Sequence, residues 1–254
     1  MKRYLFVLLL TVTVAHGQVD STFTDSLPAR QTFRFGVSTE LGTALTFTNL
    51  PEFRSFLRSN QITPPPIYGN SFVFNFGVRI NRVKVLAQHN LLLINIGASS
   101  PNGWVVRSQG ASYTGLSVGF DLLNNRNRRL YVGGGLGGFN TDFNLYRRAT
   151  QPVSFGSVLQ TVPAGSVPSL RLIGAGCVDV YLEYGQREKR NRSVESVIRL
   201  GYRRGTTRRS WESDAYTFTN PITERVSQVY LQATIAFSVN SNRFLQIYTR
   251  RPTP

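Results

Sequence analysis

The sequence is short of the residues on which many functional sites depend. Cys177 is the single cysteine among 254 residues, so an intramolecular disulfide and a cysteine-ligated metal cluster are both excluded. Two histidines occur, His16 and His89, and no carboxylates cluster beside either, so we predict neither a metal site nor a cofactor. After the N-terminal region, no apolar run approaches the roughly 20 residues that a transmembrane helix requires. The sequence therefore excludes a helical membrane protein.

The first 17 residues have the pattern of an export signal. Lys2 and Arg3 give a positive start, an apolar run follows over 5–14, and Ala15-His16-Gly17 offers small residues before a cleavage point. A run of about ten residues is too short to span a bilayer as a helix. We predict a signal peptide over 1–17, cleavage near Gly17, and a short N-terminal extension over 18–31.

Acidic residues are also scarce. The chain has 13 Asp and Glu against 29 Lys and Arg, which gives a formal net charge of +16. Basic proteins of this kind often bind nucleic acid or anionic surfaces. An exported protein rarely meets nucleic acid, so we predict none as a partner. The predicted partners are outer-membrane lipid and lipopolysaccharide, with a surface ligand or protein as a further possibility.

What the sequence has in abundance is alternation of apolar and polar residues. Between 32 and 239, segments recur in which every second side chain is apolar, as in a strand with one apolar face. One short helix is indicated at 51–60, inside a long connection. We count eight strand segments, with an uncertainty of one or two, at about 33–42, 72–80, 83–97, 113–123, 129–146, 170–183, 194–203 and 226–239.

The connections between these segments alternate strictly between short and long. Short, polar connections lie at 81–82, 124–128 and 188–192, and long ones lie at about 46–71, 98–112, 147–168 and 206–224. In an up-and-down barrel this order places every long loop at one end and every tight turn at the other, as in outer-membrane barrels. We predict an all-β fold, a closed antiparallel up-and-down transmembrane β-barrel over 32–239, followed by a C-terminal tail over 240–254.

The polar face of the predicted strands carries few charges, and they are of both signs. An eight-stranded barrel has an interior just wide enough to be filled by side chains, so opposite charges there can pair across the lumen. A charge facing lipid at the bilayer midplane costs roughly 2–4 kcal/mol, which favours placing these residues inside. The predicted luminal network consists of Arg34, Glu40, Arg79, Asp121, Arg171, Asp179, Glu183 and Arg199.

Three stretches carry a resemblance to a known group. The segment Tyr113-Thr-Gly-Leu-Ser-Val-Gly-Phe-Asp-Leu-Leu, the segment Arg129-Leu-Tyr-Val-Gly-Gly-Gly-Leu-Gly and the closing Ala233-Thr-Ile-Ala-Phe resemble the small outer-membrane β-barrel proteins of the OmpX/PorT-like kind. The likeness covers about 32–239 and is one of pattern more than of fixed motif. It implies a location in the outer membrane of a Gram-negative bacterium and a porin-like barrel.

The predicted function is non-enzymatic, with long extracellular loops that mediate surface interaction around a filled lumen. Such loop tips usually carry recognition, and Trp211 and Tyr216 are the candidate recognition residues. Two alternatives stay open. A lipid-modifying barrel enzyme would use His89, although a luminal histidine in a polar network is the simpler interpretation. A soluble, lipocalin-like periplasmic barrel would hold an apolar ligand.

Overall fold

The computed structural model describes residues 35–92, 97–123, 125, 127–148, 169–188 and 193–240. The predicted signal peptide, the extension over 18–31 and the tail beyond Asn240 lie outside these residues. Arg34, the first residue of the predicted luminal network, also lies outside them.

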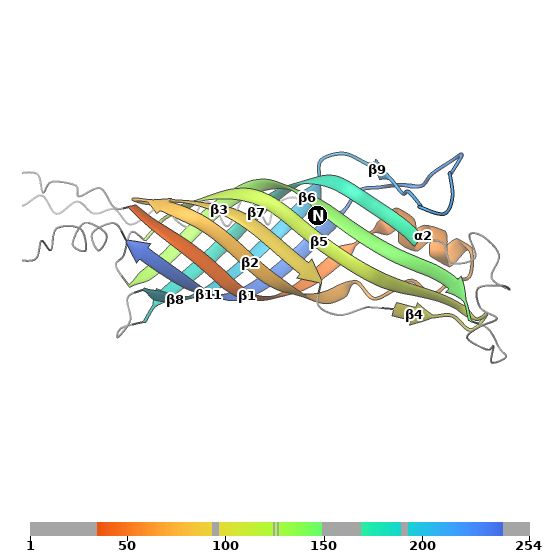
Figure 1. Ribbon diagram of the computed structural model, residues 1–254, viewed down its shortest axis with the longest axis horizontal. Coiled ribbons are helices and arrows are strands. Elements are labelled where there is room, and N and C mark those ends of the chain that lie inside the picture. Colours follow the sequence, from red (N-terminus) through yellow and green to blue (C-terminus); the bar gives the residue numbers. More distant parts are fainter. Residues whose placement is uncertain are drawn as a thin grey trace, which may run out of the picture. The chain divides into compact units, whose positions relative to one another are not determined.

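Eight long antiparallel strands close into a barrel (Figure 1). Each strand pairs with its neighbour in sequence, and the last strand pairs with the first, so the topology is the predicted up-and-down ring. The ring is formed by β1 (Phe35–Asn49), β2 (Tyr68–Ile80), β3 (Val83–Leu92), β5 (Trp104–Asp121), β6 (Arg128–Arg147), β7 (Ser169–Arg187), β8 (Val194–Gly205) and β11 (Ser227–Asn240).

Smaller elements lie in the long connections. The helix α2 (Pro51–Ser59) follows β1 and confirms the helix predicted there, and β4 (Gly97–Ser99) pairs with the outer part of β5. A two-stranded ribbon of β9 (Arg209–Ser210) and β10 (Thr223–Glu224) lies between β8 and β11. These elements gather at the end of the barrel that we call the loop end (Figure 1). No helix among the described residues has the length and apolar character needed to span a membrane.

Several strands extend further toward the loop end than the alternation predicted. β5 begins at Trp104, nine residues before the predicted start at Tyr113, and β2 begins at Tyr68 instead of Phe72. In β5 a register irregularity between Ser108 and Gly110 shifts the pairing with β6. Such a bulge breaks the period of two while the backbone remains paired, so the pattern of side chains gives no sign of the strand.

The outer surface of the ring is apolar and the inner surface is polar. Along β5, Leu116 is 64% exposed whereas its neighbour Ser117 is 1% exposed, and the other strands alternate in the same way. The exposed apolar side chains on the eight strands include Leu41, Phe74, Phe76, Leu91, Val118, Leu136, Val180, Leu182, Ile198, Leu200, Leu231 and Ile235. We refer to them together as the apolar belt.

The interior of the barrel differs between its two halves. The half nearer the tight turns holds charged side chains, which are described in the next subsection. The half nearer the loop end holds an apolar core, in which Phe53 and Leu57 of α2 pack among Val106, Phe139 and Leu172 of the strands. Phe53 and Leu57 are four residues apart, so they lie on one face of the helix and are buried together.

Candidate functional site: the filled lumen

The centre of the lumen holds two carboxylates and two cations from four different strands. Lys84 Nζ on β3 lies 2.5 Å from Glu40 Oε1 on β1 and 2.5 Å from Glu183 Oε1 on β7. Arg199 Nη2 on β8 lies 2.5 Å from Glu183 Oε2 and 3.3 Å from Glu40 Oε2. The four side chains are buried, and their formal charges cancel. This arrangement satisfies the requirement that buried charges be paired and hydrogen-bonded.

A second set of ion pairs lies nearer the tight turns. Arg79 Nη2 is 2.9 Å from Asp121 Oδ2, and Arg129 Nη1 is 2.9 Å from Glu195 Oε2. Arg187 Nε lies 3.7 Å from the same oxygen of Glu195. These side chains come from β2, β5, β6, β7 and β8, so the ion pairs cross-link most of the ring from inside.

A third layer, on the side of the central cluster toward the loop end, is built around Arg203. Its guanidinium carbon lies 3.6 Å from the ring centroid of Tyr113 and 4.0 Å from that of Tyr230, in cation–π contact with both. Arg203 Nη1 donates a hydrogen bond of 2.8 Å to Gln228 Oε1. The Tyr230 hydroxyl in turn donates to Asp179 Oδ1 at 2.9 Å, which links Asp179 to this layer.

Glycines on the ring make room for the tyrosines that point inward. A Cβ at Gly201 would lie 2.3 Å from Cζ of Tyr230, and a Cβ at Gly133 would lie 2.4 Å from Cζ of Tyr181. Neither distance is compatible with a side chain. The glycine-rich stretch of β6 is therefore part of the packing of the lumen.

The loop end of the lumen is covered by α2 and the β9–β10 ribbon. The backbone N–H of Phe53, in the first turn of α2, donates a hydrogen bond of 2.8 Å to Glu224 Oε2 on β10. The Phe53 ring stacks on Trp211 with centroids 4.6 Å apart. Burial raises the pKa of the Glu224 carboxyl, and the hydrogen bonds from backbone N–H groups partly offset that rise. The ribbon thus supplies both the carboxylate and the aromatic surface that hold the helix.

Most of the residues predicted for the luminal network lie together in the structure. Glu40, Asp121, Asp179, Glu183 and Arg199 are fully or almost fully buried inside the ring, and the Arg79 side chain is 18% exposed. Arg171 lies apart from them. Its side chain is 37% exposed and pairs with Asp214 and Asp142 near the loop end, where β7 has extended beyond its pairing with β8. The prediction was therefore wrong to place Arg171 in the luminal network.

Five charged members of the luminal layers were absent from the predicted network: Lys84, Arg129, Arg187, Glu195 and Arg203. Lys84 was overlooked because the leucine run around 91–93 obscures the alternation in that segment. The sequence nevertheless contained a signal, since Lys84 alternates with Val83 and Val85 as an inward residue should.

The structure places two other candidate residues differently from the prediction. Trp211 is 3% exposed and belongs to the apolar core, so it is a packing residue and not an exposed recognition residue, whereas Tyr216 is exposed. His89 lies on the outer face of β3 instead of in the lumen, and its Nδ1 is 2.8 Å from Thr114 Oγ1 on β5. The described residues contain no group of three or more His, Cys, Asp or Glu side chains arranged to hold a metal ion.

Among known proteins, solved structures of similar fold were found for this chain. No protein-family model and no curated protein matches the sequence. Ail, the attachment invasion locus protein of Yersinia pestis, solved in complex with the heparin analogue sucrose octasulfate, is 12% identical with a TM-score of 0.42, and the match covers 80% of this chain and 99% of that one.

Two further structures match at a similar level. Neisserial surface protein A is 12% identical with a TM-score of 0.39, over 80% of this chain and 96% of that one. The outer membrane protease OmpT from Escherichia coli is 7% identical with a TM-score of 0.40, over 85% and 99%. The strand pairings of the chain itself define an all-β protein with a closed eight-stranded antiparallel barrel, a fold that resembles outer-membrane barrels.

Proposed function

We propose that this protein spans the outer membrane as a filled barrel and presents its loop end to the outside, where it binds anionic surface components. The observation that carries the proposal is the reversed distribution of side chains, with an apolar belt on all eight strands around a charged, buried interior. Apolar surface of this extent is stable where lipid covers it, and it is rarely left in contact with water.

A soluble barrel that carries an apolar ligand would have the opposite arrangement. Its ligand would require an apolar cavity in the middle of the lumen and a charged outer surface. Here the middle of the lumen is occupied by Glu40, Lys84, Glu183 and Arg199, which pair with one another. The lipocalin-like alternative is therefore disfavoured.

An enzymatic role for His89 has little support in the geometry. Lipid-modifying catalysis would need a nucleophile activated by the imidazole and a third group to orient it. In the described part of the chain, the side-chain partner of His89 is the hydroxyl of Thr114, and no carboxylate is hydrogen-bonded to the imidazole. The non-enzymatic function is the better supported of the two.

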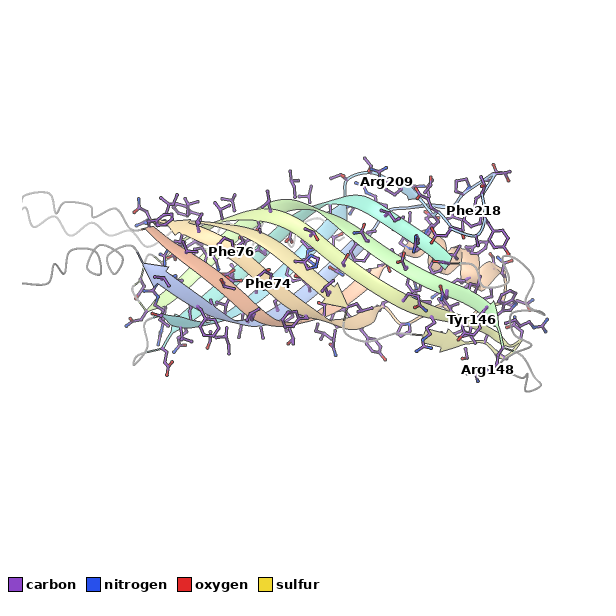
Figure 2. The ribbon with its side chains drawn as sticks, in the orientation of Figure 1. Phe74, Phe76, Tyr146, Arg148, Arg209 and Phe218 are labelled. Atoms are coloured by element: carbon purple, nitrogen blue, oxygen red, sulfur yellow. The ribbon has the colours of Figure 1, made fainter. Side chains whose placement is uncertain are left out.

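The loop end has the charge that binding to a polyanion requires. Arg148 and Arg209 mark it in Figure 2, and its exposed arginines face few exposed acids, chiefly Glu52, Glu212 and Asp214. Positive charge gathered at one end steers anionic ligands toward it and weakens as salt rises. The exposed arginines at this end are Arg58, Arg107, Arg147, Arg148, Arg204, Arg208, Arg209 and Arg225.

Membrane insertion is tested by the behaviour of the folded chain in detergent. We expect the protein to stay in the membrane fraction until detergent is added, and to migrate differently on a gel before and after boiling. Recovery of the folded protein in the soluble fraction without detergent would overturn the proposal.

Polyanion binding is tested with dextran sulfate as the probe and neutral dextran as the reference. We expect binding to dextran sulfate that weakens with salt, and a loss of about threefold or more when the two arginines Arg148 and Arg209 are changed to Gln. The matched control changes Arg82 and Arg128, at the tight-turn end, to Gln. Equal loss in both variants would show that overall charge, and not the loop end, governs binding.

A further inference from the structure

One imidazole, that of His89, lies on the outer face of the ring among the apolar side chains of the belt. His89 on β3 pairs in register with Phe74, which is the middle residue of the 13-residue strand β2. At about 3.3 Å per residue, six residues separate this position from either end of β2 by about 20 Å along the strand. On β3 itself, Val83–Leu92, His89 is six residues from the tight-turn end and three from the other end. If the barrel spans the membrane as proposed above, His89 lies within the hydrocarbon of the bilayer.

The hydrogen bond to Thr114 gives a partner to only one of the two ring nitrogens of His89. His89 Nδ1 and Thr114 Oγ1 are 2.8 Å apart, so each has the other as a partner. Within the described residues, Nε2 of His89 has no hydrogen-bond partner. Lipid tails at this depth offer no hydrogen-bonding group, and a polar atom without a partner in hydrocarbon is costly. A protein partner that reaches the same depth would satisfy it.

The outer surface around His89 consists of protruding side chains, the ridge, beside a depression, the hollow. Phe74 and Phe76, which Figure 2 labels along β2, are 44% and 50% exposed, and we refer to these two side chains as the ridge. The hollow beside them is lined in part by Ala87 and Gly134, and Leu136 forms its far side. A ridge and a hollow on the same face are the shapes that a self-complementary interface combines.

We propose that this face, defined by Phe74, Phe76, Ala87, His89, Thr114 and Leu136, binds the same face of a second copy of the chain in the membrane. In a twofold pair, both copies place His89 at the same depth. The Nδ1–Oγ1 hydrogen bond can run in either direction, so the Nε2 of one copy donates and that of the other accepts. The two imidazoles therefore satisfy each other's hydrogen bonding without any third group. The aromatic ridge of each copy enters the hollow of the other.

The proposal rests on the proposed membrane location, and the experiment separates the two. Full-length chains labelled with a donor or an acceptor fluorophore are inserted into phosphatidylcholine vesicles, and energy transfer is followed as lipid is added. We expect transfer that fits a dimer. We also expect dissociation to become about tenfold easier when His89→Leu removes the imidazole, in keeping with the loss of a hydrogen bond of ordinary strength.

Two further variants test the shape and the specificity of the face. Ala87→Phe fills the hollow and should abolish dimerisation, whereas Ser196→Ala removes an exposed hydroxyl on β8, away from the face, and should change nothing. Gel mobility before and after boiling shows that each variant is folded.

Cross-linking locates the contact directly. In a Cys177→Ala background, Leu116→Cys on this face should give a disulfide-linked dimer when membrane-permeant iodine oxidises the two thiols, and the outward-facing Ile198→Cys should not. Inserted chains that stay monomeric, or dimers that are unaffected by His89→Leu and Ala87→Phe, would overturn the inference and leave the proposed function standing. Chains that fail to insert would overturn both.

Discussion

Glu183 pairs with two buried cations, so among the luminal residues we expect its substitution to lower stability the most. Lys84 and Arg199 both contact its carboxylate, and both are buried. Glu183→Gln would leave these cations with Glu40 as their remaining acidic partner. Since breaking a buried ion pair leaves an uncompensated charge, we expect a loss of about 3–5 kcal/mol in the free energy of unfolding. Urea unfolding in vesicles, followed by tryptophan fluorescence, measures it.

The exposed pair of Arg171 and Asp214 provides the control for this prediction. Their side chains are 37% and 62% exposed, so water already screens the attraction. Asp214→Asn should therefore cost about 1 kcal/mol or less. Similar losses for Asp214→Asn and Glu183→Gln would mean that the luminal cluster is open to water.

Gly201 tests the packing of tyrosines inside the ring. A methyl group at this position would lie where Tyr230 now lies, and the displaced ring would lose its hydrogen bond to Asp179. We expect Gly201→Ala to lower the free energy of unfolding by about 1–3 kcal/mol, as overpacking does. Gly110→Ala, where a Cβ meets nothing within 4 Å, should leave stability nearly unchanged. The same urea experiment compares the two, and equal effects would contradict the packing argument.

At the scale of elements, the attachment of α2 should depend on pH through Glu224. Burial raises the pKa of this carboxyl in the folded protein above its ordinary value of 4.5. The folded state therefore holds the proton more tightly than the unfolded state. The resulting stabilisation is full below the unfolded pKa and is lost as pH rises through the folded pKa. Attachment should accordingly strengthen as the pH falls from neutral toward the ordinary pKa of 4.5.

The variant Glu224→Gln isolates this effect. The amide oxygen still accepts the hydrogen bond from Phe53, but the group no longer titrates, so the pH dependence of attachment should shrink. Trp211 fluorescence reports it, with Trp104→Phe removing the second tryptophan. Glu188→Gln, at an exposed carboxyl beside the tight turn after β7 and far from α2, is the control. An unchanged pH profile in Glu224→Gln would assign the effect to another group.

The elements themselves were largely predictable, and their contacts were not. A period of two identifies a strand wherever one face is apolar, so the number of strands, the order of connections and the helix near 51–60 could all be derived from the sequence. Which charges meet in the lumen depends on the register and tilt of the whole ring. Lys84 and Glu183 are 99 residues apart and come together only after closure. The burial of Trp211 depends likewise on where α2 comes to lie.

At the scale of the whole molecule, the filled lumen predicts the absence of a steady pore. The central cluster and the Arg203 layer occupy the interior, and α2 covers the loop end. In planar bilayers the inserted wild-type protein should show no lasting conductance step. Boiled protein serves as the control for leakage that does not depend on the fold. A stable open level in the wild type would mean that the luminal side chains rearrange in the membrane.

The alternation of side chains also bears on how such a chain could leave the cytoplasm. A segment is retained in the inner membrane when it forms a continuous apolar helix of about 20 residues. Charges near the centre of such a segment strongly oppose its insertion. Here Glu40, Lys84, Asp121, Asp179 and Arg199 each place a charge within a strand of the ring. If the chain is exported as proposed, the charges that fill the closed barrel also prevent its unfolded strands from inserting as membrane helices during translocation.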